Sequence, residues 1–178
     1  MRAMERFQKE CAGFFDQLSI EGQKPLVFGD GPSCRPVLML VGEAPGEQEA
    51  LMGKPFVGKA GKNLDGFLQA VGLKREEIYI TNVVKVRPTK TSAAGRVVNR
   101  PPSREEKALF TPWLMREVAL VRPEALVTLG NVAFTLPMFA LYHPASVIYN
   151  GSLKEVYARD LEALARSLHA KTDAPDDI

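Results

Sequence analysis

The sequence predicts an α/β fold: a single domain over residues 1–178, with three layers in which helices cover both faces of a central, mostly parallel sheet of four strands. Short apolar runs alternate along the chain with segments that have helical periodicity. Each run ends in a break rich in glycine, proline or polar residues, as buried strands of parallel sheets do. The chain has 178 residues, 46% of them hydrophobic, which is enough for one domain with a sizeable core.

The first half of the chain shows this alternation clearly. Apolar residues at helical spacing predict a helix at about 3–18, in which Cys11 is a small core residue. A loop rich in glycine and proline, at 22–36, leads into a short buried strand at 37–41. A second helix follows the next loop and ends at Gly72, which is typical of a C′ residue.

The second half continues in the same way. Strands are predicted at 78–84, 125–129 and 136–142, and an amphipathic helix closes the fold at about 156–168. We expect the acidic tail from about residue 171 to be frayed. No internal repeat or domain boundary is visible.

A polar segment at 85–107 carries seven lysines and arginines against two glutamates. It is either a solvated, mobile loop or a surface that meets phosphate groups, and charge alone leaves both interpretations open. Ser103 and Glu106 form a capping-box pattern at the start of the next helix. Thr111 and Pro112 resemble a second helix start, which predicts a kink there.

Composition excludes several classes of protein. The apolar runs are too short to span a bilayer, and the first ten residues lack the apolar core of a secretory signal, so we expect no membrane partner. Cys11 and Cys34 give no disulfide framework, which favours a cytoplasmic location. Together with His143 and His169 they match no zinc-binding spacing, so no metal site is predicted.

Three segments leave the carboxyl ends of predicted strands: GEAPGEQE, TNVVK and YHPAS. In a parallel sheet these ends share one edge, so residues far apart in sequence are expected to converge. The converging side chains are Glu43, Glu49, Phe56, Asn82 and His143. An amide, an aromatic ring, an imidazole and carboxylates suit a flat heterocycle with hydrogen-bond donors and acceptors along its edge.

The same segments carry a family resemblance. They are GEAPGEQE at 42–49, PFVGKAGKNL at 55–64, YITNVVKVRP at 79–88, LVRPEALVTLG at 120–130 and YHPAS at 142–146. In these motifs and their order the chain resembles the uracil-DNA glycosylase superfamily, and most of all its family four. The resemblance implies a DNA-repair hydrolase that cleaves the N-glycosidic bond of deoxyuridine in DNA and releases uracil. No lysine is clearly placed for a Schiff base, so we predict a monofunctional enzyme without lyase activity.

The resemblance also implies roles for individual residues. His143 would donate to uracil O2 as the uracil anion leaves. Glu43, with the backbone of Ala44, would position the attacking water and stabilise the positive charge on the sugar. Phe56 would stack on the base. Asn82 would accept from N3–H and donate to O4, a pattern that cytosine reverses.

Further residues would complete the site. Glu49 would close the space beside uracil C5 and exclude the methyl group of thymine. Val147 or Ile148 would fill the gap that the flipped base leaves in the stack. The expected DNA contacts are Lys85, Arg87, Ser146, Val147 and Ile148.

Each of these roles has a simpler alternative. Asn82 is then a cap at a strand end, Phe56 fills the core under its loop, and His143 bonds only to backbone. The two glutamates, Glu43 and Glu49, are then carboxylates in solvent.

The chain departs from the family pattern in two places. The family's iron–sulfur cluster uses four cysteines, yet Val86 stands where the third is expected and no cysteine follows Cys34. We therefore predict no cluster and no other cofactor. Only twelve residues separate Gly130 from His143, a tight crossover between parallel strands. Either this stretch is trimmed in this chain, or residues are missing from the sequence.

Three functions remain open on the sequence alone. The first is a monomeric uracil-DNA glycosylase without a cluster, acting on uracil-containing DNA. The second is the same fold acting on another deaminated base, hypoxanthine or xanthine. The third is a non-catalytic protein that binds DNA or a nucleotide.

Overall fold

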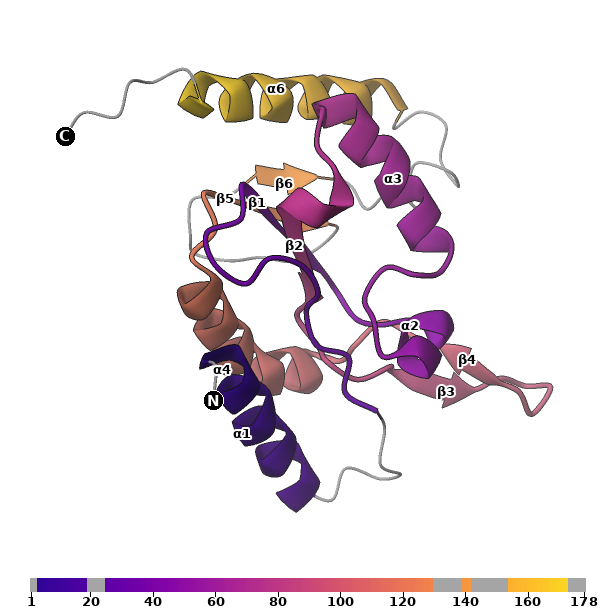
Figure 1. Ribbon diagram of the computed structural model, residues 1–178. Coiled ribbons are helices and arrows are strands. Elements are labelled where there is room, and N and C mark those ends of the chain that lie inside the picture. Colours follow the sequence, from indigo (N-terminus) through magenta and orange to yellow (C-terminus); the bar gives the residue numbers. More distant parts are fainter. Residues whose placement is uncertain (1–2, 19–24, 130–138, 142–153, 173–178) are drawn as a thin grey trace.

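The structure is a computed structural model that describes residues 3–18, 25–129, 139–141 and 154–172 (Figure 1). In chain order its elements are α1 (Ala3–Gln17), β1 (Leu38–Gly42), α2 (Glu47–Met52), α3 (Lys59–Val71), the 3₁₀ turn η1 (Arg75–Glu77), β2 (Ile78–Asn82), β3 (Thr89–Thr91), β4 (Val97–Asn99), α4 (Arg104–Val121), β5 (Ala125–Leu129), β6 (Phe139–Leu141) and α6 (Lys154–Thr172). The predicted α/β class is confirmed.

The central sheet has the strand order β2-β1-β5-β6, and each neighbouring pair is parallel. Gly42 at the end of β1 is the register partner of Asn82 at the end of β2. At the other side of the sheet, Leu129 is the partner of Leu141. The carboxyl ends of the strands therefore lie along one edge, as the sequence predicts.

Helices cover both faces of the sheet (Figure 1). On one face, α3 and α6 pack over the sheet through Leu64, Phe67 and Leu164, which join strand residues such as Leu40 and Val127 in one buried cluster. Strand side chains alternate between the two faces, so the neighbouring positions along β1 point to the other layer.

The second layer is formed by α1 and α4, which contact each other beneath the opposite face (Figure 1). Its centre is aromatic: the rings of Phe15 and Phe110 stack with centroids 4.1 Å apart, and Trp113 lies against Phe7 and Phe14. Because aromatic pairs bury large apolar areas, this contact anchors α1 to the body of the fold.

The polar segment at 85–107 is not the structureless loop that its lack of periodicity indicates. It contains the antiparallel hairpin β3–β4, in which Lys90 is opposite Val98. The turn between the strands places Gly95 at a φ of +73°, a conformation that favours glycine. The hairpin lies beside α2 (Figure 1).

The start of α4 is as predicted. Ser103 and Glu106 form a capping box in which each side chain accepts from the other residue's backbone N–H. Pro112 lies inside one continuous helix instead of starting a second one. No helix among the described residues is long and apolar enough to cross a membrane.

Candidate functional site

Asn82 and Phe56 meet at the end of β1, over Gly42. A Cβ placed on Gly42 would lie 2.7 Å from Cζ of the Phe56 ring and closer still to Oδ1 of Asn82. Both side chains thus occupy the space that a side chain at position 42 would fill, because Gly42 has none. The predicted convergence of the β1 and β2 ends is real for these two residues, and glycine at position 42 is what permits it.

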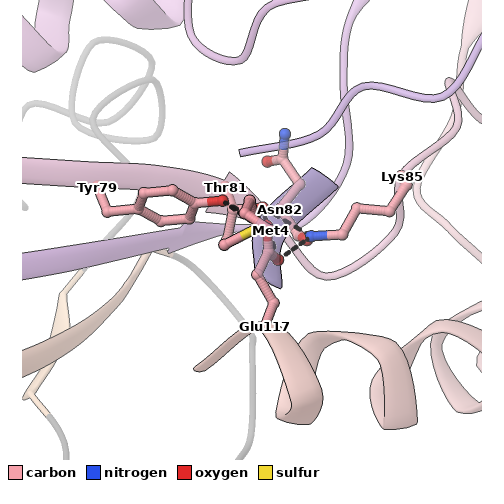
Figure 2. A network of polar contacts seen from close by, with 6 residues as sticks. All are labelled: Met4, Tyr79, Thr81, Asn82, Lys85 and Glu117. Carbon is pink, nitrogen blue, oxygen red and sulfur yellow. Dashed lines mark hydrogen bonds and ion pairs between the residues drawn. The ribbon is translucent and has the colours of Figure 1, made fainter. Parts of the chain in front are cut away.

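The Asn82 side chain lies almost fully inside the protein. The residue is 2% exposed, and among the described residues its carboxamide makes no hydrogen bond. It points away from the polar network beneath it (Figure 2). Buried amides are normally hydrogen-bonded, and with no partner among the described residues this one has its donors and acceptor available for a ligand.

The backbone holds Phe56 in an unusual conformation. Its φ is +53°, in the left-handed region that residues other than glycine rarely adopt. Arg75 donates to the carbonyl oxygens of Pro55 and Phe56, at 2.9 and 3.1 Å. A Cβ on Gly61 would collide with the Phe56 carbonyl, so that glycine is required as well. Strain held in place by several contacts is common at binding sites.

Glu49 connects the two loops of the site. Its carboxylate accepts hydrogen bonds from the backbone N–H groups of Gly46 at 3.1 Å, Val57 at 3.1 Å and Gly58 at 2.7 Å. The residue is buried, so the interpretation of it as a carboxylate in solvent is wrong. Because three amides share its two oxygens, Glu49 fixes the loop that carries Phe56 relative to the loop after β1.

Glu43 is half-buried and paired. Its Oε1 lies 2.6 Å from Nζ of Lys107, in the first turns of α4. Its backbone oxygen accepts from Val84 N–H at 3.1 Å, which ties the β1 loop to the turn after β2. The neighbouring Ala44 packs against the α1–α4 layer. The carboxylate of Glu43 is therefore held in one place at the carboxyl edge of the sheet.

The prediction that Lys85 contacts DNA is wrong. Its side chain is fully buried, and its ammonium group pairs with Glu117 of α4 in the core (Figure 2). The carboxylate of Glu117 also accepts from the hydroxyls of Tyr79 and Thr81. Burial, together with this carboxylate, raises the pKa of the Tyr79 phenol, so the phenol stays protonated and donates.

Positive charge remains on the hairpin. Arg87 is mostly buried at its base and bonds to Asn99 at 2.6 Å and Glu47 at 3.2 Å. Lys90 and Arg96 are exposed, and within the described ranges neither forms an ion pair. Arg104, at the start of α4, is exposed as well and has no ion pair with a described residue, so three basic side chains of this segment can meet a phosphate, two of them on the hairpin.

The donor set does not fit an iron–sulfur cluster. The chain has two cysteines, whereas a cluster of the kind discussed above needs four thiolates. Cys11 is buried against Phe15, Val86 and Phe110, and burial raises the pKa of its thiol to about 12. Cys34 is exposed. Apolar side chains surround the one buried thiol.

Other predicted site residues fall outside the described ranges. These are His143, Ser146, Val147 and Ile148. Strand β6 ends at Leu141, the register partner of Leu129 at the end of β5, and His143 follows two residues later in the sequence.

Sequence reasoning missed three residues that shape the site. They are Arg75, Lys107 and Glu117. Arg75 lies in the 3₁₀ turn η1 and the other two lie on α4, and charged residues on a helix usually belong to its solvent-exposed face. The one available signal is at Glu117: apolar residues at 114 and 121 place it on the same helical stripe, so it faces the core. Neither Arg75 nor Lys107 has a comparable signal.

Comparison with known proteins gives concordant results. The family model of the uracil DNA glycosylase superfamily matches residues 28–165. The type-4 uracil-DNA glycosylase of Saccharolobus solfataricus is 32% identical over 179 residues, which cover 84% of this chain and 79% of that protein. The type-4 enzyme of Archaeoglobus fulgidus is 36% identical over 156 residues, covering 71% and 74%.

A solved structure shares the fold. The crystal structure of Pedobacter heparinus SMUG2 superposes with a TM-score of 0.57 at 16% identity, and the match covers 79% of this chain and 77% of that one. At this identity the likeness concerns the arrangement of helices and strands alone.

Proposed function

This chain belongs to the uracil DNA glycosylase superfamily, and we propose that it excises uracil from DNA by hydrolysing the N-glycosidic bond of deoxyuridine. The product would be free uracil and an abasic site in DNA, the first step of base-excision repair. An enzyme of this kind takes the base out of the stack into a site that reads its edge and its face.

The observation that carries this proposal is the meeting of Asn82 and Phe56 over Gly42. A carboxamide that makes no hydrogen bond to the described residues, beside an aromatic ring, offers one group for the Watson–Crick edge of a base and one for its face. A carboxamide held in one orientation accepts from N3–H and donates to O4 of uracil. Cytosine presents the reverse pattern and leaves both groups unpaired, which disfavours it strongly.

The remaining chemistry requires a donor for the leaving base and a carboxylate near the sugar. In the proposed mechanism His143 donates to uracil O2 while the C–N bond breaks and negative charge moves onto the base. Glu43 and the backbone of Ala44 position the water that attacks the anomeric carbon, and the carboxylate stabilises the positive charge that develops there. The ion pair with Lys107 supports this role because it holds the Glu43 carboxylate at the carboxyl edge.

Glu49 has a double role in the proposal. Its hydrogen bonds to three backbone amides support the expectation that it shapes the space beside uracil C5, because it holds the Phe56 loop at a fixed distance from the end of β1. The methyl group of thymine would then find no room.

We propose that the hairpin β3–β4 contributes the phosphate contacts expected of this segment. Lys90 and Arg96 are its exposed cations, and Arg87 lies at its base beside α2. Val147 and Ile148 remain the candidates for the residue that fills the gap left in the DNA stack by the flipped base. Two unpaired cysteines suit a reducing compartment, so we place the enzyme in the cytoplasm, as a monomer without a membrane partner.

An excision assay tests the proposal. Oligonucleotides that contain uracil, hypoxanthine or xanthine, single-stranded and paired, are incubated with the protein, and abasic sites are revealed with alkali. We expect release of uracil, a much slower but measurable release in Asn82→Ala and in His143→Ala, and no strand breakage without alkali. Release of hypoxanthine or xanthine instead would move the protein to another substrate, and no release of any base would leave only a binding role.

A further inference from the structure

A buried ion pair lies directly beneath the turn that carries Asn82. Nζ of Lys85 and Oε2 of Glu117 are 2.5 Å apart, and both side chains are 0% exposed (Figure 2). Taking two charges out of water is costly, and apolar residues of similar volume often give equal stability. A pair in this position therefore calls for an explanation other than stability.

Hydrogen bonds use the whole of the Lys85 ammonium group. Its three acceptors are Oγ1 of Thr81 at 2.6 Å, the backbone oxygen of Asn82 at 2.7 Å and the carboxylate of Glu117. An ammonium group has three protons, so none is left for substrate or phosphate. Lys85 acts on the protein itself: it reaches back three residues and holds the peptide group that follows the Asn82 side chain.

The same turn is tied to the loop after β1. Val83 N–H donates to the Gly42 oxygen at 2.9 Å, and Val84 N–H donates to the Glu43 oxygen at 3.1 Å. A change in the Asn82 peptide would therefore also move the backbone of the loop that carries Glu43. The turn connects the base-reading amide with the carboxylate near the sugar.

Residues of helix α4 hold both the Asn82 turn and the Glu43 carboxylate in position. Glu117 holds Asn82 through Lys85, and Lys107, ten residues earlier, holds Glu43. At a rise of 1.5 Å per residue these two anchors are about 15 Å apart along the helix. The first contact is buried and the second is partly exposed, so the buried one defines the position more firmly.

We propose that Lys85 and Glu117 are positioning residues, which fix the backbone of the Asn82 turn and thereby the orientation of the carboxamide that selects uracil. This inference rests on the proposed function, because it assigns a task to the pair within that same site. It differs from a purely structural role in one respect: the effect of the pair on excision passes through the Asn82 side chain.

The test uses the double variant Lys85→Met/Glu117→Gln, which removes both charges without leaving one of them buried alone. The glutamine keeps an oxygen for the hydroxyls of Tyr79 and Thr81. The control is Val121→Ala, one turn beyond Glu117 on α4, which is fully buried and loses apolar contacts in the same layer. Single-turnover release of uracil is measured well below the melting temperature of every variant.

The second arm is a double-mutant cycle in which the same substitutions are made in an Asn82→Ala background. We expect the double variant to release uracil about tenfold or more slowly than the wild type, and the control within about twofold. In the Asn82→Ala background the double variant should lose less than about twofold further. An equal loss in both backgrounds, or a double variant as active as Val121→Ala, would overturn the proposal.

Two further outcomes of the experiment also decide the proposal. If the wild type releases no uracil, the proposed function fails and hydrogen exchange decides the inference: faster exchange of the Val83 and Val84 amides in the double variant, but not in Val121→Ala, supports it, and equal exchange overturns it. If the double variant does not fold, the single variant Glu117→Gln, which retains the hydrogen-bond acceptor, is measured against the same criteria.

Discussion

The carboxamide oxygen of Asn82 and the ring of Phe56 meet over a single backbone position, although the two residues are 26 positions apart in the sequence. The two come from different segments, one from the end of β2 and one from the loop between α2 and α3. Gly42, the register partner of Asn82, leaves the space in which they meet. The proposed uracil site depends on this arrangement more than on any single catalytic group.

Adding one methyl group at this position should disable the site. In Gly42→Ala the new Cβ would lie less than 3 Å from both Asn82 and Phe56, so both must shift. Because a displacement of about 1 Å at a reacting centre costs about 100-fold in rate, we expect excision to fall by about that factor. Single-turnover release of uracil measures it.

The matched control is Gly66→Ala in α3. No atom lies within 4 Å of a Cβ there, and the residue is exposed. We expect unchanged excision and a gain of roughly 0.5–1 kcal/mol in the free energy of unfolding, since alanine favours helix over glycine. Equal activity of the two alanine variants would show that the space over Gly42 is not used by the substrate.

The ion pair at Glu43 gives a second prediction. Lys107→Met leaves the Glu43 carboxylate without its partner on α4, so the carboxylate samples more orientations. We expect excision to slow by about threefold to tenfold, whereas Lys107→Arg should retain activity within about twofold. Thermal unfolding should change little, because a partly exposed pair contributes about 1 kcal/mol or less. A rate unaffected by Lys107→Met would remove Lys107 from the account.

The strands β1 and β2 show which parts of the fold the sequence predicts. Short apolar runs correctly predict these two buried strands and the shared edge, because a parallel strand buried on both faces is a nearly continuous run of apolar residues. Position 72 was also predicted correctly: Gly72 ends α3 with a φ of +73°. A buried strand and the end of a helix both depend on residues that are close together in the sequence, so the sequence pattern predicts them.

The errors have a different physical origin. Lys85 looks like a surface cation because lysine is rarely buried, and the partner that makes burial possible is 32 residues away on α4. The hairpin β3–β4 lacks strong periodicity because each strand has three residues and is mostly exposed. Thr111 and Pro112 resemble a second helix start, yet α4 continues across them, with Phe110 and Leu114 buried on either side.

The hairpin should account for part of the salt dependence of DNA binding. Each phosphate contact contributes a slope of about 0.7–0.9 to the fall of log K with log salt concentration. In Lys90→Ala/Arg96→Ala we expect that slope to decrease by about 2. The control is Arg159→Ala/Arg166→Ala on α6, which removes the same charge from exposed positions elsewhere. A decrease of the same size in both variants would assign the effect to net charge alone.

Purified protein should be colourless. We predict no absorbance near 400 nm, because four-cysteine clusters are coloured and this chain has two cysteines, one of them buried among apolar side chains. Purification without oxygen, followed by iron analysis, provides the measurement. A brown preparation that contains stoichiometric iron would contradict the prediction and would require ligands other than cysteine.

The most direct test is a crystal structure of the protein with uracil bound, at a resolution that shows the base and its contacts. The account predicts the uracil ring stacked on Phe56, the Asn82 carboxamide bonded to N3–H and O4, and the imidazole of His143 next to O2. Uracil bound elsewhere, or an Asn82 side chain and a His143 imidazole that open onto different sides of the molecule, would contradict it.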